Sequence, residues 1–161
     1  AQHYFTSALV TAIAACVFAI FVFKNSPNRK LAHHFIWYSF CISYWSFFVF
    51  ACTAASSHDL SYRLAQACHV IGVFIPVAFL HFVNVLIKST SKWLKRVISV
   101  AYLIIGFIAL AILIKPELFI TDVTPKLTFH FFPNPGPLFY LWTILFAVLV
   151  AIALFVLFFE D

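Results

Sequence analysis

Charged residues and glycines are scarce in this sequence. Of its 161 residues only 9% are Asp, Glu, Lys or Arg, three are Gly and none is Met, whereas 65% are hydrophobic and 22 are Phe. A soluble domain usually carries about 25% charged residues and could not cover so many bulky apolar side chains. The composition therefore excludes an ordinary water-soluble domain and indicates a protein whose main solvent is lipid.

Motifs of catalysis and metal binding are also missing. The sequence has no paired carboxylates within an apolar run, no phosphate-binding glycine loop, no H-E-x-x-H motif and no C-x-x-C pair. All four Cys lie inside apolar runs, where this residue usually serves as a small hydrophobe. For Cys52 and Cys68, expected toward the same membrane face, we favour two buried thiols over a disulfide. We therefore predict no enzyme, no cofactor and no metal in this chain.

Five apolar runs are long enough to cross a bilayer as helices. A hydrocarbon core of about 30 Å requires roughly 20 helical residues, because backbone polar groups in lipid need partners within their own segment. None of the runs contains Asp, Glu, Lys or Arg, each of which costs about 2.5 to 3.5 kcal/mol at mid-membrane. The predicted spans are 4–23, 35–55, 64–87, 97–114 and 138–159. We predict an all-α integral membrane protein, residues 1–161 forming one transmembrane domain of about five helices.

Basic residues gather in alternate connections. Seven of the ten Lys and Arg lie in the connections 24–34 and 88–96, whereas 56–63 and 115–137 carry few or balanced charges. The positive-inside rule assigns the basic connections to the cytoplasm, so the N-terminus is predicted outside and the C-terminus inside. Residues 127–132 alternate before a Pro- and Gly-rich segment at 133–137, which predicts a turn there and a short outer hairpin before the fifth helix. Basic residues dispersed in this way argue against a nucleic-acid partner.

Polar side chains are concentrated in the third span. Gln66 and His69 are three residues apart, as are His81 and Asn84, so each pair shares one helix face. Pro76 lies between the pairs and lacks an amide donor, which predicts a kink. This pattern fits a ligand cavity, or alternatively hydrogen bonds between helices worth about 0.6 kcal/mol each.

Other aromatic and titratable residues also stand out. Trp45, near the middle of the second span, is placed to pack against neighbouring helices or to cap a pocket. His58 and His130 are predicted outside, as solvated side chains or as pH reporters, because imidazole titrates near 6.5. His69 and His81 are twelve residues apart, about 18 Å along a helix, too far to share one metal ion.

Four motifs give the chain a family resemblance. They are the basic turn KNSPNRK at 24–30, Tyr44-Trp45-Ser46, Phe79-Leu80-His81-Phe82 after Pro76, and PGPLFY at 135–140. In order, spacing and position, over nearly the whole chain, they resemble the N-terminal seven-transmembrane sensor region found before bacterial histidine kinases and some diguanylate cyclases. The chain departs from that pattern in having five predicted spans and no cytoplasmic module before Asp161.

The resemblance implies a sensor domain in a bacterial inner membrane. Such a domain would detect a small or lipophilic signal and relay it to a cytoplasmic histidine kinase or cyclase module, as a homodimer or with other membrane subunits. The candidate ligand-binding or signal-sensing residues are Trp45, Gln66, His69, Pro76, His81 and Asn84.

Two other functions fit the same composition. The alternative is a non-catalytic accessory subunit of a larger membrane complex, packed against other subunits, lipids, pigments or quinones. A transporter or channel is disfavoured because only two histidines in the spans could serve an ion or substrate path.

Reporter tags test the predicted topology. Tags inserted at Asn28 and Ser91 are expected on the same, cytoplasmic side, because both lie in basic connections. A tag at Asp59 is expected on the other side. Paired reporters, one active only in the cytoplasm and one only outside it, make the measurement. Tags at Asn28 and Ser91 on opposite sides would refute the five-span topology.

Overall fold

Helices make up most of the fold. The computed structural model describes residues 2–126 and 129–159. In chain order the elements are α1 (Gln2–Asn25), α2 (Arg29–Ala54), α3 (His58–Gly72), α4 (Ile75–Leu86), α5 (Lys92–Ile114), the 3-10 helix η1 (Pro116–Leu118), β1 (Ile120–Lys126), β2 (Phe129–Pro135) and α6 (Pro137–Phe159). Five helical segments are long and apolar enough to cross a membrane, with α3 and α4 together making one of them. The predicted number of spans is confirmed on length and composition.

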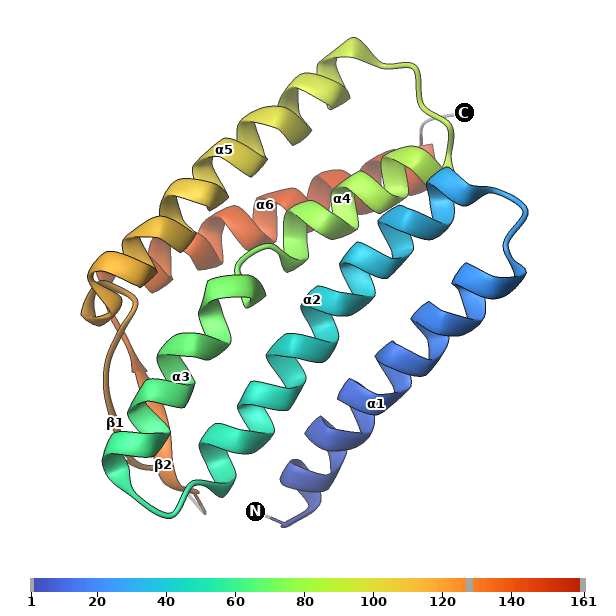
Figure 1. Ribbon diagram of the computed structural model, residues 1–161. Helices are drawn as coiled ribbons and strands as arrows, with labels where there is room; N and C mark the ends of the chain where they lie inside the picture. The colour runs from blue at the N-terminus through green and yellow to red at the C-terminus, as the bar shows by residue number, and fades with distance from the viewer. Residues whose placement is uncertain (1, 127–128, 160–161) are drawn as a thin grey trace.

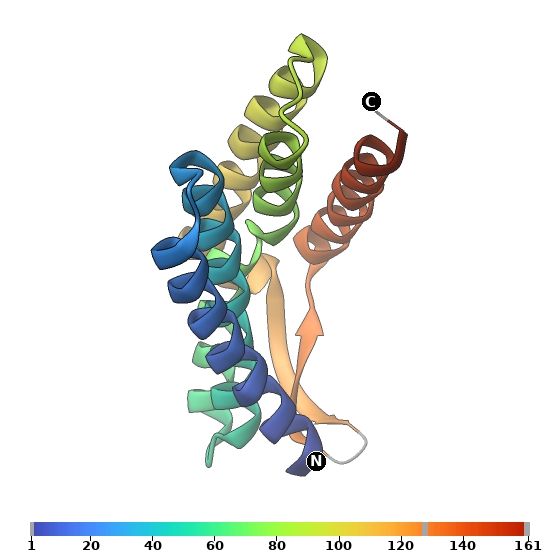
Figure 2. The same ribbon diagram turned by 90° about the vertical axis from the view of Figure 1, so that its right-hand side faces the viewer.

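The helices form a bundle with two distinct ends. α1 packs along α2, α2 packs along α3 and α4, and α6 packs against α4. α1 and α2 lie on one side of the bundle and α6 on the other, with α4 between them (Figure 2). The basic α1–α2 and α4–α5 connections lie at one end, here called the basic end, and the hairpin and the α2–α3 turn lie toward the other, the hairpin end (Figure 1).

Three helices begin before the predicted apolar runs because polar side chains cap them. The side chains of Asn28, Ser57 and Ser91 each accept a hydrogen bond from the backbone N–H three residues later, at 3.1, 3.4 and 3.3 Å. Such caps satisfy backbone donors that have no partner within the helix. The predicted connections 24–34 and 88–96 are therefore shorter in the structure, and most of their basic residues lie on the first turns of helices.

The predicted third span is broken into two helices. α3 ends at Gly72 and α4 begins at Ile75, and the N–H of Phe74 donates to the carbonyl of Ile71 at 3.0 Å. Pro76 lies in the first turn of α4, where its missing N–H would have no partner within that helix. The kink predicted from Pro76 is confirmed, and it falls immediately before that residue.

A β-hairpin precedes α6, as predicted. The two strands pair antiparallel, with Val123 opposite Pro133. The turn predicted at residues 133–137 is wrong, because most of that segment belongs to β2. A two-stranded sheet accepts proline because each strand has a free edge where a missing N–H removes no ladder hydrogen bond. Leu127 and Thr128, where the predicted alternation begins, lie outside the described residues.

Buried and exposed apolar side chains separate cleanly. Side chains at the centre of the core, with relative exposure of 0 to 1%, include Leu80, Leu94, Ile105, Phe119 and Val156. Large apolar side chains on the outer faces are exposed, including Phe18, Phe21, Leu103, Phe107, Phe155 and Phe158. An apolar exterior of this extent over α1, α5 and α6 fits contact with lipid and is foreign to a soluble monomer. The chain is a membrane protein.

Two glycines provide a matched test of the packing. A Cβ on Gly136, between β2 and α6, would collide with the backbone carbonyl of Leu118. Gly136→Ala is expected to lower the free energy of unfolding by about 1 to 3 kcal/mol because backbone must move. A Cβ on Gly106, within α5, meets nothing within 4 Å. Gly106→Ala should raise stability slightly, by about 0.5 to 1 kcal/mol. Thermal unfolding in detergent, followed by circular dichroism, makes the comparison; equal midpoints would contradict this packing.

Candidate functional site

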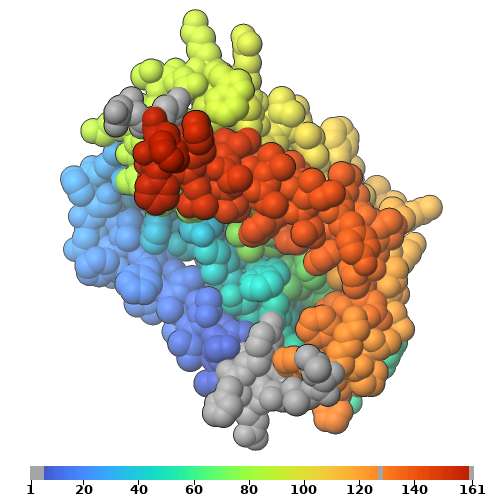
Figure 3. All heavy atoms as spheres, turned by 180° about the vertical axis from the view of Figure 1, so that it is seen from behind, coloured from blue at the N-terminus to red at the C-terminus, as the bar shows by residue number. Residues whose placement is uncertain are grey.

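A largely apolar cavity lies between α2, α3, the hairpin and the start of α6. Its volume is about 410 Å³. The walls include Trp45 and Val49 from α2, Ala65, Cys68 and His69 from α3, Ile120, Lys126 and Phe132 from the hairpin, and Phe139 from α6. Seen from behind, part of α2 is visible in a recess bordered by α6 and the hairpin (Figure 3). Volumes of about 300 to 1,000 Å³ with few polar groups are typical of small-molecule sites.

His69 contributes an oriented polar group to this cavity. The residue is only 9% exposed, and its Nδ1 lies 2.8 Å from the carbonyl oxygen of Ala65. A carbonyl oxygen only accepts, so Nδ1 carries the proton and Nε2 of the neutral ring is an acceptor. The ring also packs against Phe119 and Phe139, with centroids 4.9 and 6.0 Å apart. His69 therefore offers a hydrogen-bond acceptor in a fixed orientation.

Trp45 forms a flat wall of the cavity, and Gly72 makes room for it. A Cβ at position 72 would lie 2.7 Å from Cδ1 of the indole ring. Next to this contact the Tyr44 hydroxyl donates to the carbonyl of Ala67 at 2.9 Å, and the Cys68 thiol lies 3.5 Å from the carbonyl of Trp45. The absence of a side chain at Gly72 thus lets α2 and α3 approach closely at this point.

The cysteines near the cavity are free thiols. Cys52 and Cys68 are both buried and neither forms a disulfide. The Ser61 hydroxyl donates to the carbonyl of Cys52 at 3.0 Å and lies 3.3 Å from its sulfur. The expectation of two buried thiols is confirmed. Within residues 2–126 and 129–159, no three His, Cys, Asp or Glu side chains come together as a metal site would require.

His81 lies apart from the cavity. Its Nδ1 is 3.3 Å from the Tyr102 hydroxyl oxygen, and its ring packs on that of His34 with centroids 4.0 Å apart. These contacts join α4 to α5 and to α2. His81 is placed to link three helices, the interhelical role that the sequence left open beside ligand binding.

Of the six candidate residues, Trp45 and His69 are the two that line the cavity. Gln66 is half-buried on α3 and Pro76 is buried in the core. Asn84 is buried near the basic end, where it lines a second and separate pocket. Trp45 and His69 thus line one cavity, whereas the other candidate residues are distributed along α3 and α4.

Comparison with known protein families decides the assignment of the chain. Residues 7–160 match the model of the family described as the N-terminal 7TM region of histidine kinase. The chain belongs to this family. Neither the curated proteins nor the solved structures gave a significant match. The family consists of sensor regions of histidine kinases and not of catalytic domains, so the resemblance found in the sequence is confirmed.

The hairpin contributes to the cavity of this sensor region in a way that the sequence analysis missed. Lys126 and Phe132 both line the cavity, and the Lys126 ammonium lies 5.4 Å from the centroid of the Phe132 ring. A contact of this length is within the range of a cation–π interaction. The sequence carried one signal of this role: a segment rich in Phe and Pro at 129–137 leads directly into the fifth span. A hairpin formed there and folded against the bundle would bury some of these Phe side chains.

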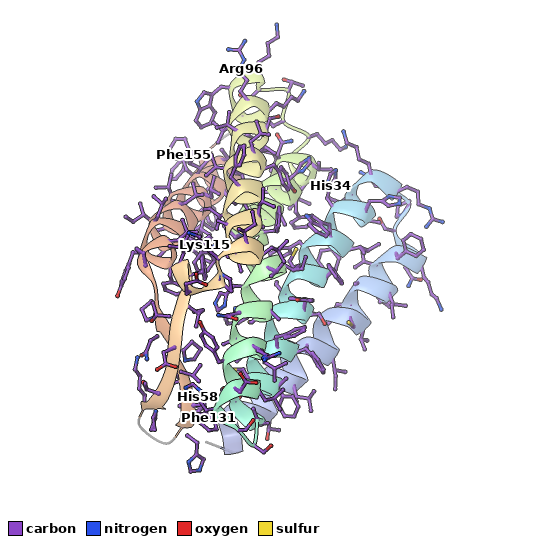
Figure 4. All side chains as sticks on the ribbon, turned by 60° about the vertical axis from the view of Figure 1, so that its left-hand side comes forward. His34, His58, Arg96, Lys115, Phe131 and Phe155 are labelled. Carbon is purple, nitrogen blue, oxygen red and sulfur yellow. The ribbon has the colours of Figure 1, made fainter. Side chains whose placement is uncertain are left out.

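A hydrogen bond fastens the hairpin to α3. His58 Nε2 lies 2.8 Å from Asp122 Oδ1, and the His58 ring meets Phe131 edge to face (Figure 4). The Asp122 carboxylate accepts a hydrogen bond from the N–H of Val123 and, as a smaller effect, one from His58. These contacts lower the pKa of the Asp122 carboxyl below its usual value. The hairpin thereby stays next to the α2–α3 turn and closes one side of the cavity.

The contacts of the Asp122 carboxylate predict a pH-dependent hairpin. Since folding lowers the Asp122 pKa, the carboxylate stabilises the hairpin fully above its ordinary pKa, and this stabilisation is lost as the pH falls through the lowered value. Asp122→Asn should increase amide hydrogen exchange of β1 and β2 severalfold at neutral pH. The difference from wild type should vanish at low pH.

Asp59→Asn is the matched control. Asp59 pairs with Arg63 one turn away in α3, at 3.1 Å, and that pair does not reach the hairpin. Its loss should leave the exchange of β1 and β2 unchanged. Equal effects of the two variants would show that the His58–Asp122 pair does not hold the hairpin.

Proposed function

We propose that this chain is the input domain of a sensor kinase, and that a small lipophilic signal binds in the cavity lined by Trp45 and His69. The bound signal is relayed to a histidine kinase or cyclase module on the cytoplasmic side. The observation that carries this proposal is a largely apolar cavity of about 410 Å³ into which His69 brings a hydrogen-bond acceptor, in a member of a sensor-region family.

The walls favour a largely apolar ligand with one hydrogen-bond donor. Trp45 and Phe139 offer aromatic faces to an aliphatic chain or a ring. The Nε2 of His69 is an acceptor, because its Nδ1–H is committed to the carbonyl of Ala65. A buried acceptor rejects ligands that leave it unpaired. A hydroxyl group on a lipophilic molecule is the chemistry that satisfies both requirements.

An aromatic cluster connects the cavity to the break in the third span. The ring of Phe139 lies 5.5 Å from that of Trp142, and both contact His69. The indole N–H of Trp142 donates to the carbonyl of Val73 at 3.2 Å, within the break between α3 and α4. A ligand that displaces Phe139 would move α6 against α4, provided it binds one arrangement more tightly than the other. α6 then carries the shift toward the basic end.

We place the basic end in the cytoplasm and the cavity toward the outer face of a bacterial inner membrane. Seven of the ten Lys and Arg lie in or beside the two connections at the basic end. By the positive-inside rule, connections rich in Lys and Arg lie on the cytoplasmic side. The N-terminus is then outside. Arg96 projects at the same end (Figure 4). The exposed apolar faces would contact lipid, and a homodimer or other membrane subunits would join the same bundle.

A pair of matched ligands tests the hydroxyl requirement. In the complete receptor in nanodiscs, medium-chain alcohols should change kinase autophosphorylation at concentrations about 2- to 10-fold lower than their methyl ethers, which lack the donor. His69→Phe should abolish this discrimination because the acceptor is lost while the ring remains. His130→Phe, on an exposed position of the hairpin, is the control and should preserve it.

A second variant examines the cavity itself. Gly72→Ala should push the Trp45 ring and weaken both ligand classes equally, since His69 is untouched. Discrimination that survives His69→Phe, or a response unaltered in both variants, would refute the role of this cavity.

A further inference from the structure

A second pocket lies at the basic end, away from the cavity described above. Its volume is about 320 Å³. Polar lining residues come from three parts of the chain: Asn28 and Lys30 at the start of α2, Asn84, Lys88 and Ser89 at the end of α4, and Lys95 on α5. The pocket is therefore assembled by the fold and is not a stripe of neighbouring residues along one helix.

The charges around this pocket are of one sign. Lys30, Lys88 and Lys95 converge on it, and the N-terminus of α2 adds the positive end of a helix dipole. The acidic side chains that the structure describes, Asp59, Glu117 and Asp122, belong to the first turn of α3 and the segment before and within β1, toward the hairpin end. Within the described part of the chain the three lysines have no carboxylate partner. The pocket favours an anion.

Asn84 adds a requirement for a hydrogen-bond donor, which a fully deprotonated anion or an ionised phosphodiester alone does not meet. The residue is only 8% exposed, and its Oδ1 is buried without a hydrogen-bond partner among the described residues. An amide oxygen accepts hydrogen bonds, and a buried acceptor left unpaired is costly. The side chain lines the pocket. An occupant should therefore carry a donor, such as a hydroxyl, beside its negative charge.

Lys88 occupies a backbone position that normally belongs to glycine. Its φ is 55°, the only positive φ of a non-glycine residue among the described residues. The N–H of Ser89 donates to the carbonyl of Asn84 at 3.1 Å and the N–H of Lys88 to that of Val85 at 3.2 Å. These two bonds form a Schellman motif, in which glycine is preferred at the position of Lys88. Lysine is less favourable than glycine for helix termination here, and the Lys88 side chain lines the pocket.

We infer that this pocket binds the headgroup of an anionic glycerophospholipid, with the phosphodiester held by Lys30, Lys88 and Lys95 and a headgroup hydroxyl donating to Asn84 Oδ1. The position of the site at the ends of membrane-spanning helices favours a lipid over a soluble phosphate ester. Lys30 and Lys88 lie just outside the predicted spans 35–55 and 64–87. Nearby Trp93, at the start of α5, is 55% exposed, and tryptophan is enriched at membrane interfaces.

Two lipids of equal charge test the chemistry. The full chain is placed in phosphatidylcholine nanodiscs containing phosphatidylglycerol or phosphatidylmethanol, which lacks the hydroxyls. Phosphatidylglycerol should raise the midpoint of thermal unfolding and should be retained in native mass spectrometry about 2- to 10-fold more strongly than phosphatidylmethanol. Asn84→Leu should remove this preference. Equal retention of the two lipids by wild type would overturn the hydroxyl assignment.

Lysine variants separate a site from diffuse attraction. Lys95→Ala should lose the effect of phosphatidylglycerol, whereas Lys92→Ala, the same charge change three residues away and outside the lining, should keep it. Equal losses would overturn the site. Lys88→Gly should lose the lipid effect and yet raise the unfolding midpoint in phosphatidylcholine alone, because glycine suits the positive φ. A lipid effect that persists in Lys88→Gly would also overturn the proposal.

A competition experiment identifies the source of the headgroup. Soluble glycerol phosphate should displace phosphatidylglycerol weakly, since the acyl chains hold the lipid at the site. Efficient displacement would overturn the lipid assignment in favour of a free phosphate ester.

Discussion

Every backbone N–H and C=O in lipid must find a partner within the protein, and this constraint shapes the whole chain. It requires helices wherever the sequence lies in the membrane, which explains five long apolar helical segments in so short a chain. It also makes the break between α3 and α4 expensive unless its freed groups are satisfied. The carbonyl of Val73 is satisfied by the indole of Trp142 from α6. The kink is therefore stabilised by a helix distant in sequence, and α6 is bound to it.

The number and approximate position of the spans could be predicted because length and charge exclusion are local properties of the sequence. The helix starts were less predictable. The caps at Asn28, Ser57 and Ser91 begin the helices earlier than the apolar runs, and hydropathy averaged over about twenty residues does not detect a single capping residue. The kink was readable from Pro76 alone. The position of Pro133 and Pro135 within β2 could not be predicted, because proline occurs both in turns and in edge strands.

The candidate site was only partly predictable for a different reason. Trp45 and His69 stood out as polar or aromatic residues in apolar spans, which is a local signal. Their cavity is closed by Lys126, Phe132 and Phe139, which come from a hairpin and a helix entry that only tertiary packing brings there. Asn84 and His81 are three residues apart on one helix, yet they have different neighbours. His81 contacts Tyr102 and His34, whereas Asn84 lines the pocket at the basic end.

The prolines of the hairpin have a consequence for how copies of this protein could associate. A two-stranded sheet exposes open edges that invite a strand from another chain, and Pro125, Pro133 and Pro135 cannot supply the N–H groups such an added strand would need. Edge-to-edge extension of the sheet is thereby discouraged. Each hairpin is thereby kept as the cover of the cavity in its own chain and does not become part of a shared sheet.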